Sequence, residues 1–200
     1  MTRKELINIV KTKVDELSPV DAEIQFINPM EDKPIDSFVD NLLDECAKEV
    51  LQKAPVSRLD GVSENVEVHA NKDGSGYIVL PDNFIRLLEF KMAGWKRAVV
   101  SVAEPGSEIA LKQSNRFLRG GCCKPVCVFS HRPEGRVMEY YSVQKKHEVD
   151  RFIYVKFIKA EELSWGLQDV LTWWCASRVF EIVGKLEEAK FAYERGGSLL

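Results

Sequence analysis

Apolar residues at helical spacing mark the beginning of the chain. The first stripe recurs every three or four residues and predicts a short helix that ends at Ser18-Pro19; it consists of Leu6, Val10, Val14 and Leu17. The second stripe predicts a helix over residues 34–53, with Pro34 near its start and Pro55 beyond its end; it consists of Ile35, Phe38, Leu42, Leu43, Cys46, Val50 and Leu51. Residues 18–34 contain three prolines and are expected to be a connecting arm.

The pattern changes to that of a β-block over residues 66–158. Residues 77–80 and 84–92 predict two strands around a corner at Pro81-Asp82, and Ala93-Gly94 predicts a tight reversal into a strand over 95–102. Residues 126–130 and 136–143 predict a hairpin around residues 132–135. The last strand, 152–158, alternates and places four side chains on one side, namely Phe152, Tyr154, Lys156 and Ile158.

Residues 103–125 follow neither period. A connection of this length in a compact domain is usually functional or disordered. We therefore expect residues 103–125 to be either a functional loop or a disordered one.

A helical pattern returns over residues 162–195. Its main apolar stripe consists of Thr172, Ala176, Val179, Val183, Leu186, Ala189 and Tyr193. Trp173 and Phe180 occupy a further face, and a helix that is apolar on several sides is buried between partners in its own chain or in a neighbouring subunit. Gly184 predicts a kink or break, and Gly196-Gly197 predicts the end of the helix.

These elements predict an α+β fold in which N-terminal helices and a long C-terminal helix pack with a central antiparallel β-domain. The expected organisation is an N-terminal helix and arm over 1–33, followed by one domain over 34–200. With 200 residues, of which 45% are apolar and 30% charged, the chain is large enough for a real core. The net charge of −3 predicts no general attraction to nucleic acid or membrane.

The five cysteines are odd in number, and Cys46 and Cys175 fall on apolar helix faces, which favours a reducing compartment over a disulfide framework. The N-terminus lacks the continuous apolar run of a signal peptide or a membrane span. We expect the protein to be soluble and cytoplasmic when it is made.

The strongest candidate for chemistry is the group Cys122, Cys123, Cys127 and His131, whose side chains are typical zinc ligands. Its spacing departs from the usual Cys-x2-Cys pair, and on an extended strand Cys127 and His131 lie about 13 Å apart. The bases available to a cysteine nucleophile lie in no recognisable motif; they are His69, His131 and His147. Gly120-Gly121 lacks the pattern of a phosphate loop. We expect no enzyme activity and no cofactor, with zinc as a weak alternative.

Two charged groups have both a simple and a functional interpretation. The basic group is either a solvated rim or a surface for an acidic partner or phosphates; it consists of Arg116, Arg119, Lys124, Arg132 and Arg136. The acidic group is either a solvated helix face or a surface past which a negatively charged partner slides without binding; it consists of Asp36, Asp40 and Asp44.

The order of several segments resembles the head-to-tail adaptor (connector) proteins of short-tailed phages, including the tail tubular adaptor type and the ring proteins of crAss-like phages of gut Bacteroidales. The likeness extends from Pro34 to the C-terminus. It is carried by a helix ending in Ala54-Pro55, the strand and corner YIVLPDNFIRL at 77–87, the Gly94-Trp95 hairpin, the loop from Gln113-Ser114-Asn115 through Arg119-Gly120 to Lys124-Pro125-Val126, and the closing helix 167–195.

The resemblance implies a homo-oligomeric ring, usually dodecameric, at the head–tail junction of a virion, assembled in the host cytoplasm. Its partners would be the portal protein and other tail or ring proteins, with double-stranded DNA nearby and no membrane. Trp173 and Phe180 would lie between subunits, the loop 103–125 would interlock with a neighbour, and the acidic group would face the lumen. The alternative is a soluble domain that binds a small ligand or nucleic acid through the Cys122–His131 region.

Overall fold

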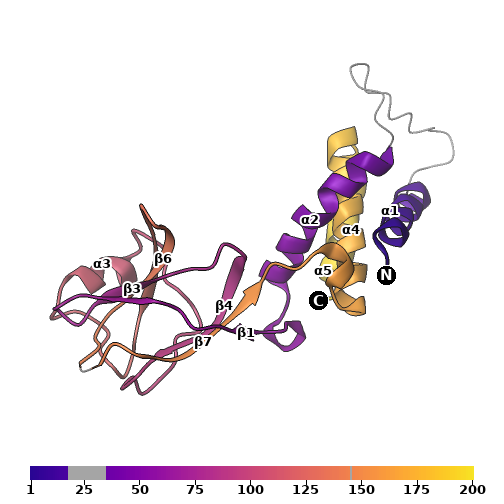
Figure 1. Ribbon diagram of the computed structural model, residues 1–200. Coiled ribbons are helices and arrows are strands. Elements are labelled where there is room, and N and C mark those ends of the chain that lie inside the picture. The colour runs from indigo at the N-terminus through magenta and orange to yellow at the C-terminus, as the bar shows by residue number, and fades with distance from the viewer. Residues whose placement is uncertain (18–34, 145) are drawn as a thin grey trace. The chain divides into compact units, whose positions relative to one another are not determined.

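The computed structural model describes residues 1–17, 35–144 and 146–200 (Figure 1). It divides into two compact units: a helical unit of Met1–Arg58 and Phe157–Leu200, and a β unit of Leu59–Lys156. The α+β class predicted from the sequence is confirmed. The boundary between the units differs from the one expected after residue 33, because the first helix belongs to the same unit as the C-terminal helices.

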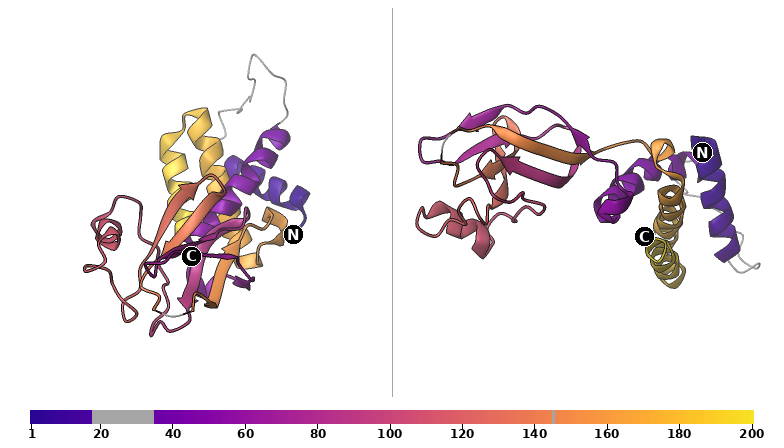
Figure 2. Two further views of the ribbon diagram at one scale, coloured as in Figure 1. Left: turned by 60° about the vertical axis from the view of Figure 1, so that its left-hand side comes forward. Right: turned by 90° about the horizontal axis from the view of Figure 1, so that it is seen from below.

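The helical unit is organised around its longest C-terminal helix, α4 (Trp165–Val183), which contacts every other α-helix of the unit. These are α1 (Arg3–Leu17), α2 (Ile35–Lys53) and α5 (Leu186–Gly197). Two short 3-10 turns, Val56–Arg58 and Ala160–Glu162, complete it. Helices α4 and α5 lie side by side (Figure 2).

The buried stripes largely match the sequence pattern. Leu6, Val10 and Val14 of α1 are buried as predicted. On α2 the buried stripe also includes Val39 and Ala47, whereas Phe38 and Leu42 are only half-buried. The buried face of α2 is therefore rotated slightly about the helix axis, toward Val39 and Ala47 and away from Phe38 and Leu42.

Helix α4 is buried within its own unit. Thr172, Ala176 and Val179 are buried as predicted. The break expected at Gly184 is confirmed, since this residue has a φ of 81° and ends α4. The predicted stripe does not continue through it, because the reversal leaves Val183 and Leu186 exposed.

Ion pairs join α1 to α2 along the acidic group. Arg3 contacts Asp40 and, at 3.1 Å, Asp44, and Lys11 contacts Asp36 at 2.7 Å. The three aspartates nevertheless remain partly solvated, with side chains 39–55% exposed, and Asp40 and Asp44 share the single cation Arg3.

The β unit contains two antiparallel sheets. One has the order β1-β7-β4, from Val62–Ser63, Val149–Lys156 and Phe84–Met92. The other has the order β2-β3-β6-β5, from Val68–Ala70, Gly76–Val79, Gly135–Tyr140 and Cys127–Arg132. Aromatic side chains of both sheets form one core that includes Phe84, Phe90, Tyr140, Phe152 and Tyr154.

Three predictions about the β unit need correction. Residues 95–102 form no strand, and only Val99 makes a bridge, to Phe90. The chain is diverted there because the N–H of Lys96 donates to the carbonyl of Cys122. The last strand is Val149–Lys156, and Lys156 at its end is exposed. Within 103–125, Glu108–Ser114 forms a helix, α3.

Candidate interaction surface

The loop that carries α3 projects from the sheets (Figure 2) and is built by local hydrogen bonds. The hydroxyl of Ser107 caps the helix by accepting from the N–H of Ala110 at 3.3 Å. The side chain of Asn115 accepts from the N–H of Phe117 at 2.9 Å and forms the turn that follows α3. These contacts define a short helix and turn without a large apolar core of their own.

Arg119 fastens this loop to the β unit. Its guanidinium donates to the carbonyl of Gln113 at 2.8 Å and pairs with the carboxylate of Asp73 at 2.7 Å. Gln113 is itself buried, and its side chain donates to the carbonyl of Ile109 at 2.9 Å. The loop is therefore held by polar contacts on its inner side.

Apolar side chains lie on the outer side of the same loop. Phe117 is 94% exposed, and Ile109, Leu111 and Leu118 are each more than half exposed. Exposing so many large apolar side chains within ten residues is unusual for a free surface and is typical of an interaction site. We call these four residues, together with Arg116 and Lys124, the α3 surface.

The structure separates the basic group into different roles. Arg119 holds the loop, Arg132 pairs with Glu139 at 2.9 Å, and Arg136 lies over the rings of Phe84 and Phe129. Arg116, Lys124 and Arg136 are exposed, and none of the three has an ion pair among the described residues. The five cations therefore do not act as one uniform basic patch.

The two aromatic residues expected between subunits lie in the helical unit. Phe180 is fully buried there, so it offers no surface to a partner in this conformation. Trp173 is half-buried, with the ammonium of Lys13 4.4 Å from its ring centroid. The sequence pattern gave no means of distinguishing these positions from the neighbouring buried residues of α4.

The four residues of the zinc alternative, Cys122, Cys123, Cys127 and His131, do not form a metal-binding cluster. Within the described residues, no group of three His, Cys, Asp or Glu side chains is placed to hold a metal ion. Cys127 is buried, and burial raises the pKa of its thiol well above the ordinary range. His131 is exposed farther along β5, while the Cys122 and Cys123 sulfurs lie 4.0 Å apart.

The other two histidines contact aromatic residues. His69 stacks on Tyr77 with ring centroids 4.6 Å apart. His147 Nδ1 shares a hydrogen bond of 2.7 Å with the hydroxyl of Tyr140, whose pKa burial raises to about 12. Among the described residues, the contacts of these two histidines are with tyrosines and none is with a cysteine.

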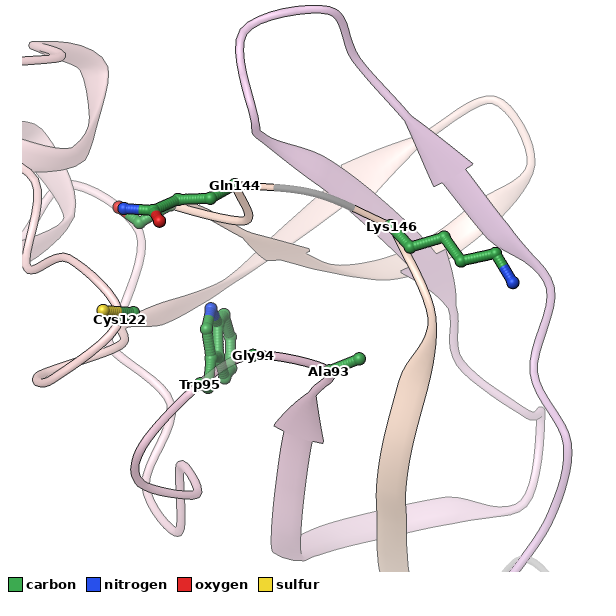
Figure 3. Close-up of a pocket in the computed structure, with 7 residues that line it drawn as sticks. Ala93, Gly94, Trp95, Cys122, Gln144 and Lys146 are labelled. Atoms are coloured by element: carbon green, nitrogen blue, oxygen red, sulfur yellow. The ribbon is translucent and has the colours of Figure 1, made fainter.

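A pocket of about 400 Å³ lies beside the turn after β4 (Figure 3). Its lining consists of Ala93, Gly94, Trp95, Cys122, Ser142, Gln144 and Lys146. The indole nitrogen of Trp95 is turned toward the segment that carries Gln144 and Lys146 (Figure 3), and it has no hydrogen-bond partner among the described residues. This donor was not among the residues predicted from the sequence.

No protein-family model matches the chain, and no curated protein matches it. Within the described residues, no helix combines the length and apolarity that crossing a membrane requires. The function is therefore inferred from the surfaces of the two units.

Proposed function

We propose that this protein is a virion structural component of a short-tailed phage, a head-to-tail adaptor that forms a ring between the portal and the tail and extends the DNA channel. The observation that carries this proposal is the α3 surface. A protein that functions by binding other subunits needs exposed apolar side chains in a fixed position. Phe117 is exposed, and its loop is joined to the β unit by the ion pair between Arg119 and Asp73.

The rest of the described chain is consistent with an assembly role. Cys127 is buried and His147 is hydrogen-bonded to Tyr140, whereas His131 and Cys123 are exposed. The order of sequence segments from Pro34 onward resembles that of adaptor proteins, and this resemblance implies a ring, usually of twelve copies, bound to a portal. The acidic group contributes little to this proposal, because Arg3 and Lys11 offset two of its three negative charges.

Co-expression with the portal protein of the same phage genome tests the function. We expect a complex that elutes together on size exclusion and shows a collar on portal rings in negative-stain images. The protein alone can remain monomeric under this proposal, because adaptors can assemble only on the portal. A portal that stays bare at a large excess of this protein would exclude the adaptor function.

A ligand-binding β unit is the second candidate, and the unpartnered indole N–H of Trp95 beside the pocket favours it. Such a donor would suit a small molecule that presents an acceptor oxygen. Native mass spectrometry of the protein purified from the expressing cells checks this candidate. A stoichiometric adduct that a Trp95→Phe variant loses would support it, and its absence from both proteins would leave the adaptor as the single proposal.

A further inference from the structure

A second exposed apolar surface lies where α4 turns into α5. Ile182 is 61% and Leu186 69% exposed, and Val183 between them is also exposed. The left-handed Gly184 produces the reversal that brings these residues to the outside. We call these three apolar residues, with Glu187 and Glu188 of the first turn of α5, the α4–α5 corner.

The two surfaces are complementary in charge. The α3 surface carries the exposed cations Arg116 and Lys124 beside its apolar side chains. The α4–α5 corner carries Glu187 and Glu188 beside Leu186, and these two carboxylates outnumber the one cation of this segment, Lys185 at the start of α5. Opposite charges at the rim of an apolar contact orient the two partners and accelerate their association.

We propose that the α3 surface of one copy docks on the α4–α5 corner of a second copy. This inference rests on the proposed ring function and adds to it the surfaces that join neighbouring subunits. The surfaces belong to different units of the chain, so the contact is heterologous, in which each copy uses one surface to bind and presents the other. Contacts of this kind produce closed rings when the rotation between copies closes.

Site-specific photocrosslinking tests the contact directly. Benzoylphenylalanine replaces Phe117, whose 94% exposure means that the change leaves the core untouched. Equal amounts of ordinary and ¹⁵N-labelled protein are mixed, with and without portal, and irradiated. We expect mixed-isotope adducts between residue 117 and peptides covering residues 181–191. The same probe at Val56, an exposed apolar residue outside both surfaces, is expected to give no such adduct.

Charge reversal provides an independent measurement. The pair Arg116→Glu and Lys124→Glu is expected to raise the dissociation constant between copies at least tenfold at low salt, and the pair Glu187→Lys and Glu188→Lys to do the same. Both pairs in one chain should restore association, measured by sedimentation velocity or, with portal, by the number of copies bound per portal.

Matched charge changes at other exposed positions control for net charge. The pairs Lys72→Glu with Lys96→Glu, and Glu45→Lys with Glu134→Lys, change the charge equally outside both surfaces and should leave association unchanged.

Several results would overturn the inference. They are adducts whose two peptides carry the same isotope, adducts from residue 117 to peptides outside residues 181–191, and the absence of any adduct both with and without portal. A combination of the two charge-reversal pairs that fails to restore association would also overturn it. Its failure is distinguishable from that of the proposed function. A portal collar without these adducts retains the adaptor and rejects the contact, whereas the adducts without a collar retain the contact and reject the adaptor.

Discussion

One guanidinium group connects the loop of α3 to the turn between β2 and β3. Arg119 is only 10% exposed at its side chain and pairs with Asp73, whose other oxygen accepts from the hydroxyl of Ser75 at 2.6 Å. The hydrogen bonds from Ser75, and then those from Arg119, hold the pKa of Asp73 well below its ordinary range. The position of the α3 surface therefore depends on an ionised carboxylate.

This dependence predicts a loss of stability in acid. Because the folded-state pKa of Asp73 is lowered, its contribution is complete above the ordinary aspartate pKa of about 3.9 and disappears as the pH falls below that value. Asp73→Asn should cost at most about 1 kcal/mol at pH 7, since the pair is partly exposed, and less at pH 3. Urea unfolding at both pH values measures the difference, and an equal cost at both would contradict the assignment.

The burial of the cysteines predicts their reactivity. Cys46, Cys127 and Cys175 are buried, whereas Cys122 is half-buried and Cys123 exposed. Burial raises the pKa of the Cys127 and Cys175 thiols, so their reactive thiolate is scarce in the folded protein. In a titration with an aromatic disulfide reagent, we expect two thiols to react quickly and three only after denaturation. Rapid reaction of all five would show that the cores open readily.

The sequence allowed the burial of Cys46 and Cys175 to be predicted, because their neighbours follow a helical period. It did not allow Arg119 to be distinguished from Arg116, since the partner of Arg119 lies 46 residues away in the chain. The same limit applies to the acidic group, whose cations come from α1. Ion pairs between distant segments leave no periodic signal.

At the scale of elements, the reversal at Gly184 is the clearest test of a backbone requirement. Its φ of 81° is a conformation that residues with a Cβ adopt at a cost of roughly 1–2 kcal/mol. Gly184→Ala should lower the free energy of unfolding by about this amount. The matched variant Gly166→Ala, inside α4 with ordinary φ and open space, should instead raise it by up to about 1 kcal/mol.

Chemical denaturation of both variants beside the unchanged protein gives the comparison. Equal effects at the two glycines would show that the reversal after Val183 is absent in solution.

The long helices were predictable because their stripes extend over several turns, and the β5–β6 hairpin because residues 132–135 have turn chemistry. Helix α3 was missed. It has seven residues, and its stability depends on the Ser107 cap and on contacts through Gln113 and Arg119 that no local pattern reveals. The strand expected at 95–102 failed because a hydrogen bond from Lys96 draws the chain toward Cys122.

At the scale of the whole molecule, the β unit is a continuous segment inserted into a helical unit made from two segments. Its ends are adjacent, because Val62 in β1 pairs with Tyr154 in β7. We therefore expect a fragment of residues 59–156 to fold alone, with dispersed amide NMR signals and a cooperative thermal transition. A fragment of 67–156, which lacks β1, should melt at a lower temperature. A random-coil spectrum from the longer fragment would contradict this division.

The insertion also determines an order of events during synthesis. The β unit has all its strands once Lys156 has left the ribosome, whereas α1 and α2 wait for α4, which begins at Trp165 and covers their apolar faces. During that interval Leu6, Val39 and Leu43 have no complete core to enter. We therefore expect the β unit to fold before the helical unit, whose first segment, residues 1–58, exposes apolar side chains to chaperones until α4 is made.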